Sequence, residues 1–434
     1  MFGYYTDLAL RSLRRDKVLT SLMVLALALG IGASITTLTV LRLLSGDPLP
    51  QKSSQLFYPR LDPRSKDGYI EGTTKPEVAL SYVDAMNLFK AHRATRQAVM
   101  AMTRAKVVLP GTKERPFYSD GVMTTADFFP MFDAPFQYGS SWTAEDEENR
   151  ANLVVIAGFL NDKLFGGANS VGKTIHVEGK DFRIVGVLKH WAPQPRFYSL
   201  DLGGRSYGDG DAVFLPLSSA RAAELGPQNV NCYGSITDLK KLETQPCVWL
   251  GMWVELNDAA AVSSYQSFLA GYAKQQAALG RFARTQTALP DLMEWIRIEE
   301  VVPDDVRLQA GLAFGFLLIC VLNTVGLLLA KCLRRSGEIG VRRALGATRR
   351  TVFAQFMVEA VMVGLTGGLL GLAFAELGLW GVRHQPAEYA SLAYLDVEMF
   401  LFTFAVAVVA SLIAGLLPAW RACALAPAPQ LKAA

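Results

Sequence analysis

The stretch VLTSLMVLALALGIGASITTLTVL, residues 18–41, decides the fold, because it holds no charged side chain. An α-helix of about 20 apolar residues crosses the roughly 30 Å hydrocarbon core of a membrane. A cleaved signal peptide is the competing interpretation, but its apolar core would be shorter and a small-residue cleavage site would follow it. The sequence therefore predicts a first membrane span over residues 18–44.

Three similar stretches follow in the last third of the chain. They are LQAGLAFGFLLICVLNTVGLLLA (308–330), VFAQFMVEAVMVGLTGGLLGLAFA (352–375) and MFLFTFAVAVVASLIAGLLPAW (399–420). Of the 434 residues, 51% are hydrophobic and 19% charged, which is too apolar for an ordinary soluble enzyme. We expect further spans over 306–330, 351–380 and 399–420. The predicted fold is a membrane protein of four transmembrane α-helices, with a large α+β domain inserted between the first and the second.

Basic residues gather on one side of these spans. Cytoplasmic flanks of membrane helices carry an excess of Lys and Arg. The loop 331–350 has seven basic residues and one acid, whereas the short loop 381–398 has one arginine and three acids. We therefore predict that both termini, with the tail 421–434, and the loop 331–350 are cytoplasmic. Residues 47–303 then lie outside the cytoplasm.

The basic charge comes from these clusters and not from one basic face. The net charge is only +4, so we expect no nucleic-acid partner. Residues 1–17, MFGYYTDLALRSLRRDK, place Tyr4, Leu8 and Leu13 towards one side and arginines towards the other. This pattern predicts an amphipathic helix on the inner surface of the membrane, in contact with lipids. An unstructured basic anchor is the alternative.

The block 47–303 mixes strand-like and helical stretches. The runs NLVVIAG (152–158) and VWLGMWVEL (248–256) are typical of buried strands, and SYVDAMNLF (81–89) has helical spacing. KTIHVEGKDFRIVGVL (173–188) alternates around a tight turn, as a hairpin does. The mixture predicts an α+β domain large enough for two subdomains. Residues 193–250, which contain Gly, Pro and Cys, are interpreted as an insertion without an assigned role.

Two of the five cysteines, Cys232 and Cys247, stand in this block and are close in sequence. In an oxidising compartment such a pair closes a small loop as a disulfide, which is our prediction. Two unrelated free thiols are the alternative. Cys320, Cys332 and Cys423 lie in or beside the membrane on the reducing side, where no disulfide is expected.

The stretch GANSVGKT, Gly167 to Thr174, matches the phosphate-loop pattern, in which Lys173 would reach phosphates and Thr174 a magnesium ion. A real phosphate loop connects a buried strand to a helix whose N-terminus faces the phosphates. Here the residues that follow have a period of two, which predicts strands. We therefore expect no nucleotide or other cofactor in this chain, and interpret the stretch as a turn into a hairpin.

No other pattern indicates a metal or catalytic site. His176 and His190 have no second ligand at metal-binding spacing, and no G-x-S-x-G elbow is present. The acidic run Glu145–Glu148 is interpreted as a solvated loop, since it lacks the spacing of a calcium-binding EF-hand. The sequence therefore predicts that the chain is not an enzyme.

The third span carries glycines and two acids. Gly364, Gly367, Gly368 and Gly371 have the small-xxx-small spacing that lets helix backbones approach closely. Carboxylates within a membrane usually face protein, water or a cation. Glu359, near the inner end, is expected to pair with nearby arginines, and Glu376 stands at the edge of the span.

The loop KCLRRSGEIGVRRALGATRRTV, residues 331–352, is rich in arginine and predicts a helix from Glu338 to Leu345, with Gly337 and Gly346 at its ends. An anchor that only sets topology needs positive charge without such a pattern. A short helix held on the cytoplasmic face between two spans is suited to dock a soluble motor protein.

At this loop the sequence resembles the MacB/FtsX family of ABC transporter permeases. The resemblance rests on GEIGVRRALGATRR (337–350) followed by FMVEAVMVGLTGGLLGLAFA (356–375), and on the hairpin GKTIHVEGKDFRIVGV, which is similar to the family's periplasmic core domain. It implies a set of residues on the element that contacts an ATPase. These are Arg335, Glu338, Ile339, Gly340, Arg342, Arg343, Gly346 and Arg349.

The resemblance also implies a function. A MacB-type permease in the bacterial inner membrane would pair with a second permease, identical or different, and with two cytoplasmic ATPase subunits that bind ATP and magnesium. It would move its periplasmic domain to expel a peptide, antibiotic or lipid-like substrate, with or without a periplasmic adaptor and an outer-membrane duct. Because MacB carries its ATPase before the first span and this chain starts close to that span, we expect the ATPase in a separate subunit.

Two alternatives differ in function class. An FtsX-like signal transmitter would use the same ATPase to switch periplasmic cell-wall hydrolases, but its outer domain is usually smaller than the block predicted here. A membrane-anchored periplasmic enzyme would not need the patterned arginine loop, and the sequence contains no catalytic constellation for it. The substrate is not encoded in any pattern that we recognise.

Overall fold

The computed structural model describes residues 15–64, 76–111, 115–233 and 236–424. The amphipathic helix predicted for residues 1–17 and the cytoplasmic tail predicted for 421–434 lie largely outside the described residues. The chain divides into two compact units. The helical unit comprises residues up to Leu44 and from Val302 onwards, and the inserted domain comprises Ser45–Val301.

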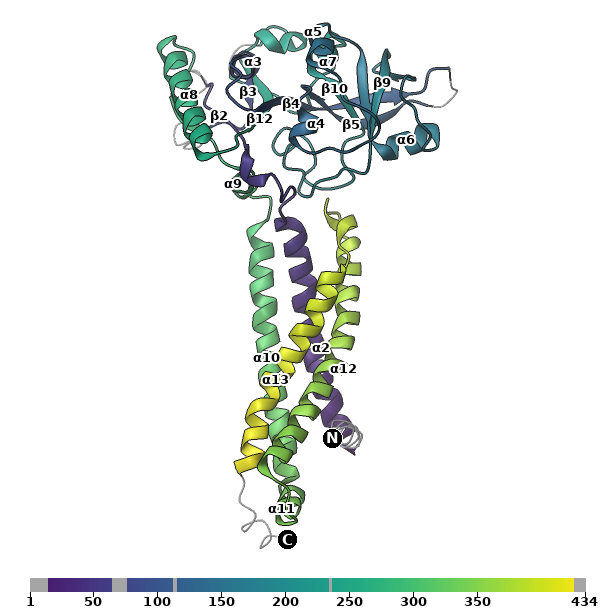
Figure 1. Cartoon of the computed structure of the whole chain (residues 1–434), viewed down its shortest axis with the longest axis vertical. Helices are drawn as coiled ribbons and strands as arrows, with labels where there is room; N and C mark the ends of the chain where they lie inside the picture. Colours follow the sequence, from purple (N-terminus) through teal and green to yellow (C-terminus); the bar gives the residue numbers. More distant parts are fainter. Residues whose placement is uncertain (1–14, 65–75, 112–114, 234–235, 425–434) are drawn as a thin grey trace. The chain divides into compact units, whose positions relative to one another are not determined.

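Four long helices form the helical unit within the described residues. They are α2 (Lys17–Ser45), α10 (Asp304–Arg334), α12 (Arg349–Arg383) and α13 (Val397–Ala424). Each is long and apolar enough to cross a membrane, which confirms the predicted four-span architecture. The short helix α11 (Ser336–Ala344) lies at one end of this unit, between α10 and α12 (Figure 1). A single 3-10 turn, η4 (Ala390–Leu392), stands in the loop between α12 and α13.

The glycines of α12 face two different neighbours. An added Cβ at Gly368 would stand 2.6 Å from the Cβ of Ala407 in α13, and one at Gly364 would clash with Ser411 of the same helix. On the α2 side, a Cβ at Gly371 would stand 3.0 Å from Cγ2 of Ile31, and one at Gly367 would stand 3.2 Å from the Cβ of Leu27. The glycine stripe therefore lets α12 approach α2 and α13 at the same time.

The inserted domain is built on one sheet of eleven strands within the described residues, with a central order of β1-β12-β4-β5-β10-β7-β9-β6. The bounds of these strands are β1 (Leu56–Phe57), β4 (Arg96–Val108), β5 (Phe117–Thr124), β6 (Phe136–Gly139), β7 (Leu153–Ile156), β9 (Lys180–Leu188), β10 (Val213–Pro216) and β12 (Cys247–Glu255). Three more strands, β3 (Leu80–Ser81), β8 (Thr174–Val177) and β11 (Asn231–Cys232), pair beside this path, and β2 (Arg60–Leu61) pairs with β13 (Thr287–Ala288).

Seven helices belong to this domain within the described residues. They are α3 (Tyr82–Lys90), α4 (Phe128–Met131), α5 (Ala144–Glu148), α6 (Gly158–Phe165), α7 (Leu217–Ala222), α8 (Ala259–Ala278) and α9 (Leu292–Ile298), with the 3-10 turns η1 (Ser53–Gln55) and η3 (Leu239–Thr244). Because the eleven strands form one sheet, the two predicted subdomains would share it. The mixture of strands and helices is the α+β character that the sequence predicted.

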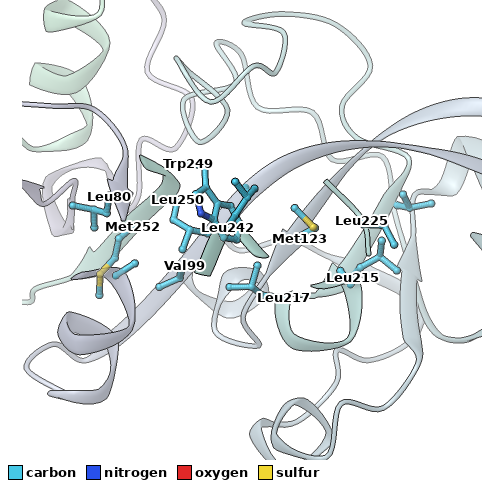
Figure 2. Packing of buried hydrophobic residues seen from close by; sticks show 14 of the residues in the cluster. Leu80, Val99, Met123, Leu215, Leu217, Leu225, Leu242, Trp249, Leu250 and Met252 are labelled. Carbon is cyan, nitrogen blue, oxygen red and sulfur yellow. The ribbon is translucent and has the colours of Figure 1, made fainter. Parts of the chain in front are cut away.

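Two apolar clusters form the core of this domain. Figure 2 shows part of the first, to which Val99, Leu215 and Trp249 all belong. The second is rich in aromatic side chains, among them Phe128 and Trp253. Strand β12 contributes to both clusters, and all nine of its residues are buried. This explains why its sequence is apolar from Cys247 to Val254 and does not alternate.

Residues 193–250, interpreted from the sequence as an insertion without an assigned role, supply β10 in the middle of the sheet and contribute to this core. Arg196 forms an ion pair with Asp211, and the Tyr198 hydroxyl donates a hydrogen bond to the same carboxylate at 2.9 Å. All three side chains are buried. Because a buried charge needs a partner, this network fixes the segment against the aromatic cluster. Cys247 at the start of β12 forms a disulfide with Cys232 in β11.

One local prediction was wrong. The acidic run Glu145–Glu148 is not a loop but most of helix α5. Thr143 and Asp146 form a capping box, in which the Thr143 hydroxyl accepts from the Asp146 backbone N–H at 3.2 Å. Acidic side chains in a first helical turn are favoured by the helix dipole. The acidic run therefore stabilises a helix where the sequence analysis expected a loop.

The glycine contacts predict a difference between two Gly→Ala substitutions in α12. Gly364→Ala should lower the thermal stability of the detergent-solubilised protein, because overpacking against Ser411 costs about 1–3 kcal/mol. Gly381→Ala is the matched control, since nothing lies within 4 Å of its added Cβ. Equal melting temperatures for the two variants would contradict the close packing of α12 on α13.

Glu147 in α5 predicts a pH dependence. Burial raises the pKa of its carboxyl to about 7, although a hydrogen bond from the Ala126 backbone N–H works in the opposite direction. A raised carboxyl pKa stabilises the fold below the ordinary value of 4.5, and this contribution is lost as the pH rises through 7. Between pH 5 and 8 the melting temperature should therefore fall by about 3 °C more in the native protein than in Glu147→Gln. Glu145→Gln, an exposed residue of the same helix, should leave that fall unchanged.

Candidate functional site

Helix α11 and its two junctions form the candidate site. Helix α10 continues to Arg334 and α12 begins at Arg349, so most of the predicted loop 331–350 is helical. Gly337, expected at the start of the short helix, lies inside its first turn. Gly346 does end it, with a φ of 101° that favours glycine. The hydroxyl of Thr348 then caps α12 by accepting from the Thr351 backbone N–H at 3.2 Å.

One face of α11 is fastened to the long helices. The buried Ile339 packs in a small cluster with Cys332 of α10, Phe356 of α12 and Ala419 of α13. Gly340, next to Ile339, is also buried. This cluster joins four helices at one point, so α11 is part of the packed unit and not a loose connection.

Polar contacts hold the flanks of α11. Arg335, at the junction with α10, forms an ion pair of 2.7 Å with Asp16, just before α2. Glu338 pairs with Arg342 at 2.8 Å, and Arg342 also donates to Oε1 of Gln355 in α12 at 3.2 Å. These partly exposed pairs contribute little stability individually, but they restrict the rotation of α11 relative to α12.

The opposite face of α11 points away from these contacts. Val341 is 49% exposed and Leu345 is 84% exposed, although both are apolar. Residues four positions apart lie on the same side of a helix, and this side is opposite to Ile339. We call Val341 and Leu345 the α11 outer face. Exposed apolar side chains bordered by basic residues are typical of a protein interaction site.

The structure divides the eight predicted coupling residues by role. Four of them shape or anchor the helix: Arg335, Ile339, Gly340 and Gly346. The other four are at least partly exposed: Glu338, Arg342, Arg343 and Arg349. Sequence reasoning missed Val341 and Leu345. Their spacing of four, opposite to Ile339, is the signal that could have found them.

The acids of α12 are both paired with basic residues. Glu359 pairs with Lys331 of α10, whereas the sequence suggested nearby arginines as its partners. Glu376 pairs with Arg383 at 2.6 Å, near the other end of α12. The two acids are thus held in the helical unit by partners on the same or a neighbouring helix.

The stretch Gly167–Thr174 has no phosphate-loop geometry. Helix α6 precedes it and strand β8 follows it, which is the reverse of the order that a phosphate loop needs. Lys173 places its Nζ 4.7 Å from the centre of the Phe165 ring. In the hairpin that follows, His176 pairs with Asp181 of the neighbouring strand.

Two family models match the chain. The MacB-like periplasmic core domain matches residues 20–269, which is more than half of the 434 residues, and the FtsX-like permease C-terminal domain matches residues 310–427. The chain belongs to the MacB/FtsX family of ABC transporter permeases. The second match includes α11 and both of its junctions, so the candidate site lies within the permease domain.

Individual relatives are exporters by name. The pyoverdine export ATP-binding/permease protein PvdT of Pseudomonas aeruginosa is 29% identical over 313 residues, which are 70% of this chain and 41% of PvdT. The macrolide export ATP-binding/permease protein MacB of Chlorobium luteolum is 22% identical over 445 residues, which are 99% of this chain and 60% of that protein. This MacB/FtsX permease thus spans about half the length of the curated relatives that it matches.

Among solved structures, the periplasmic region of MacB from Actinobacillus actinomycetemcomitans matches with 12% identity and a TM-score of 0.36. The match covers 56% of this chain and 92% of that structure. The extracellular domain of the noncanonic ABC-type transporter YknZ from Gram-positive bacteria gives the same identity and TM-score, over 54% of this chain. The four apolar helices and the inserted domain of periplasmic type fit a multi-pass protein of the inner membrane.

Proposed function

We propose that the chain is the permease subunit of a MacB-type ABC exporter, driven by ATP that a separate ATPase subunit binds with magnesium and hydrolyses. The observation that carries this proposal is the two-sided structure of α11. Ile339 anchors one side in the helical unit, while Val341 and Leu345 are exposed on the other. Such a helix can bind a soluble protein and pass its movement to the membrane helices.

The distribution of charge supports an orientation. Around α11 and the neighbouring helix ends, basic residues predominate: Arg15, Lys17, Arg334, Arg335, Arg342, Arg343, Arg349, Arg350 and Arg421 stand against Asp16 and Glu338. At the opposite ends of the helices, acids predominate: Asp47, Asp304, Asp305, Glu376, Glu388, Asp396 and Glu398 stand against Arg42, Arg307 and Arg383. By the positive-inside rule α11 is cytoplasmic, both termini are on the same side, and the inserted domain is periplasmic.

The chemistry of the α11 outer face indicates what it would bind. Leu345 is mostly exposed and would lose that exposure in an apolar pocket, while the arginines around it favour an acidic rim on the partner. Apolar anchors at the centre of an interface carry most of the binding energy, and the surrounding charges set orientation and association rate. We therefore expect the ATPase to present an apolar groove bordered by Asp and Glu.

Movement of α11 would reach the periplasm through α10, because α10 continues directly in sequence into the inserted domain. The domain would then expel a substrate that is already in the periplasm or the outer leaflet. The names of the relatives, pyoverdine and macrolide exporters, favour a peptide, antibiotic or lipid-like substrate. A second permease subunit, identical or different, would complete the complex, with or without an adaptor and an outer-membrane duct.

The size of the matched outer domain favours export over FtsX-like signalling. The MacB-like periplasmic model extends through residue 269 and includes most of the inserted domain. A signal transmitter that only switches a cell-wall hydrolase would not need so large a domain.

Docking on the α11 outer face predicts the effect of a double substitution. Val341→Ser combined with Leu345→Ser should weaken binding of the co-purified ATPase by about 30-fold, since two central apolar anchors are lost. Affinity can be measured by titrating the ATPase onto the permease in lipid nanodiscs. Leu333→Ser, which alters an exposed apolar residue of α10, is the matched control and should bind normally.

The same preparation tests where ATP is hydrolysed. The permease alone should not hydrolyse ATP, and activity should appear only with the partner. Hydrolysis by the isolated chain that Lys173→Ala abolishes would contradict the proposal. Normal ATPase affinity in the Val341/Leu345 double variant would remove α11 as the docking site.

A further inference from the structure

An ion pair joins α10 to α12 inside the helical unit. Lys331, in the last turn of α10, contacts Glu359 of α12, and the two side chains are only 2% and 1% exposed. The pair lies close to the cluster that anchors α11, since Cys332 and Phe356 of that cluster are near neighbours in sequence. Neither the sequence patterns nor the family matches assign a role to this pair.

Other ion pairs of the helical unit are open to their surroundings. The pair between Arg335 and Asp16 leaves the acid 31% exposed, and the pair between Arg383 and Glu376 leaves the acid 51% exposed. Lys331 and Glu359, by contrast, have little contact with anything but protein. An isolated charge in that position would be strongly unfavourable, so each of the two residues stabilises the charge of the other.

Stability alone does not explain a buried ion pair. Replacing such a pair with apolar residues of similar volume is often neutral or stabilising, because both charges must be desolvated. What an ion pair adds is geometry: two complementary charges fix which positions of two helices face each other, whereas apolar side chains can slide. The pair between Lys331 and Glu359 therefore fixes one point of α10 against one point of α12.

The ion pair between Lys331 and Glu359 lies next to α11. Lys331 precedes α11 in the chain and Glu359 follows it, so the pair closes the segment that contains α11. Without it, a force on α11 could be absorbed by bending at Arg335 or in the turn at Gly346, the two junctions of the short helix. With the pair formed, α10 and α12 must move together with α11.

We infer that the ion pair between Lys331 and Glu359 is the positioning element that transmits movement of α11 into α10, and through α10 to the inserted domain. This inference rests on the proposed function, because it requires an ATPase that acts on α11. Lys331 and Glu359 do not contact the ATPase or the substrate in this account. They make the membrane helices respond as one body when α11 is displaced.

Hydrogen–deuterium exchange can follow the two ends of this path separately. The full chain with its ATPase is placed in lipid nanodiscs and compared without nucleotide and with ATP trapped by vanadate. In the native protein, trapping should change exchange in α11 and also in residues 299–307, where the chain passes from the inserted domain into α10. In Glu359→Gln the α11 response should persist, while the response of residues 299–307 falls about tenfold.

Two further variants complete the test. Glu376→Gln makes the same change at the other end of α12 and should keep both responses. Lys331→Glu combined with Glu359→Lys restores an ion pair with reversed charges, so it should restore the response of residues 299–307. If Glu359→Gln does not fold, the reversed pair must recover a folded and responsive protein.

The outcomes distinguish the role of the ion pair from the docking of the ATPase on α11. An unchanged response of residues 299–307 in Glu359→Gln would overturn the inference, and so would failure of the reversed pair to restore it. Absence of any α11 response in the native protein would instead overturn the proposed docking of the ATPase. A purely structural role would lower the yield of folded protein without separating the two responses.

Discussion

Helix α12 contacts two neighbours through glycine, Gly367 and Gly371 against α2 and Gly364 and Gly368 against α13. In a membrane, helices gain little from the hydrophobic effect among themselves, so close van der Waals contact has to hold them together. These contacts make α12 the link between α2 and α13. Both α11 and the buried Glu359 depend on it, because α11 packs on its first turns and Glu359 faces α10 from its side.

The two faces of the short helix α11 differ, although their residues alternate in the sequence. Its inward residues, Ile339 above all, serve packing, and its outward residues, Val341 and Leu345, remain exposed. A rigid attachment is useful in a coupling element because a loosely held helix would dissipate movement in its own joints. The ion pair between Lys331 and Glu359 adds a second attachment, because it fixes the end of α10 relative to α12 on either side of α11.

Local patterns predicted much of the fold, and three-dimensional pairing accounts for what they missed. The apolar runs identified four spans because a helix needs about 20 apolar residues to cross the hydrocarbon core of a membrane, and few other structures require so long a run. The alternation after Lys173 predicted the hairpin of β8 and β9, and thereby excluded a phosphate loop. The partner of Glu359 is 28 residues away, and no local pattern marks it. The exposure of Leu345 likewise depends on which face of α11 packs, which the sequence does not state.

Photocrosslinking at Leu345 in living cells tests the central claim most directly. A benzophenone amino acid at this position would react with whatever covers the α11 outer face, and mass spectrometry would identify the adduct. We expect an adduct with an ABC ATPase, attached in an apolar groove that Asp and Glu residues border. The same amino acid at Leu279, which is 68% exposed in the inserted domain, should give no ATPase adduct. An adduct at Leu345 with lipid alone, or with a periplasmic protein, would contradict that claim.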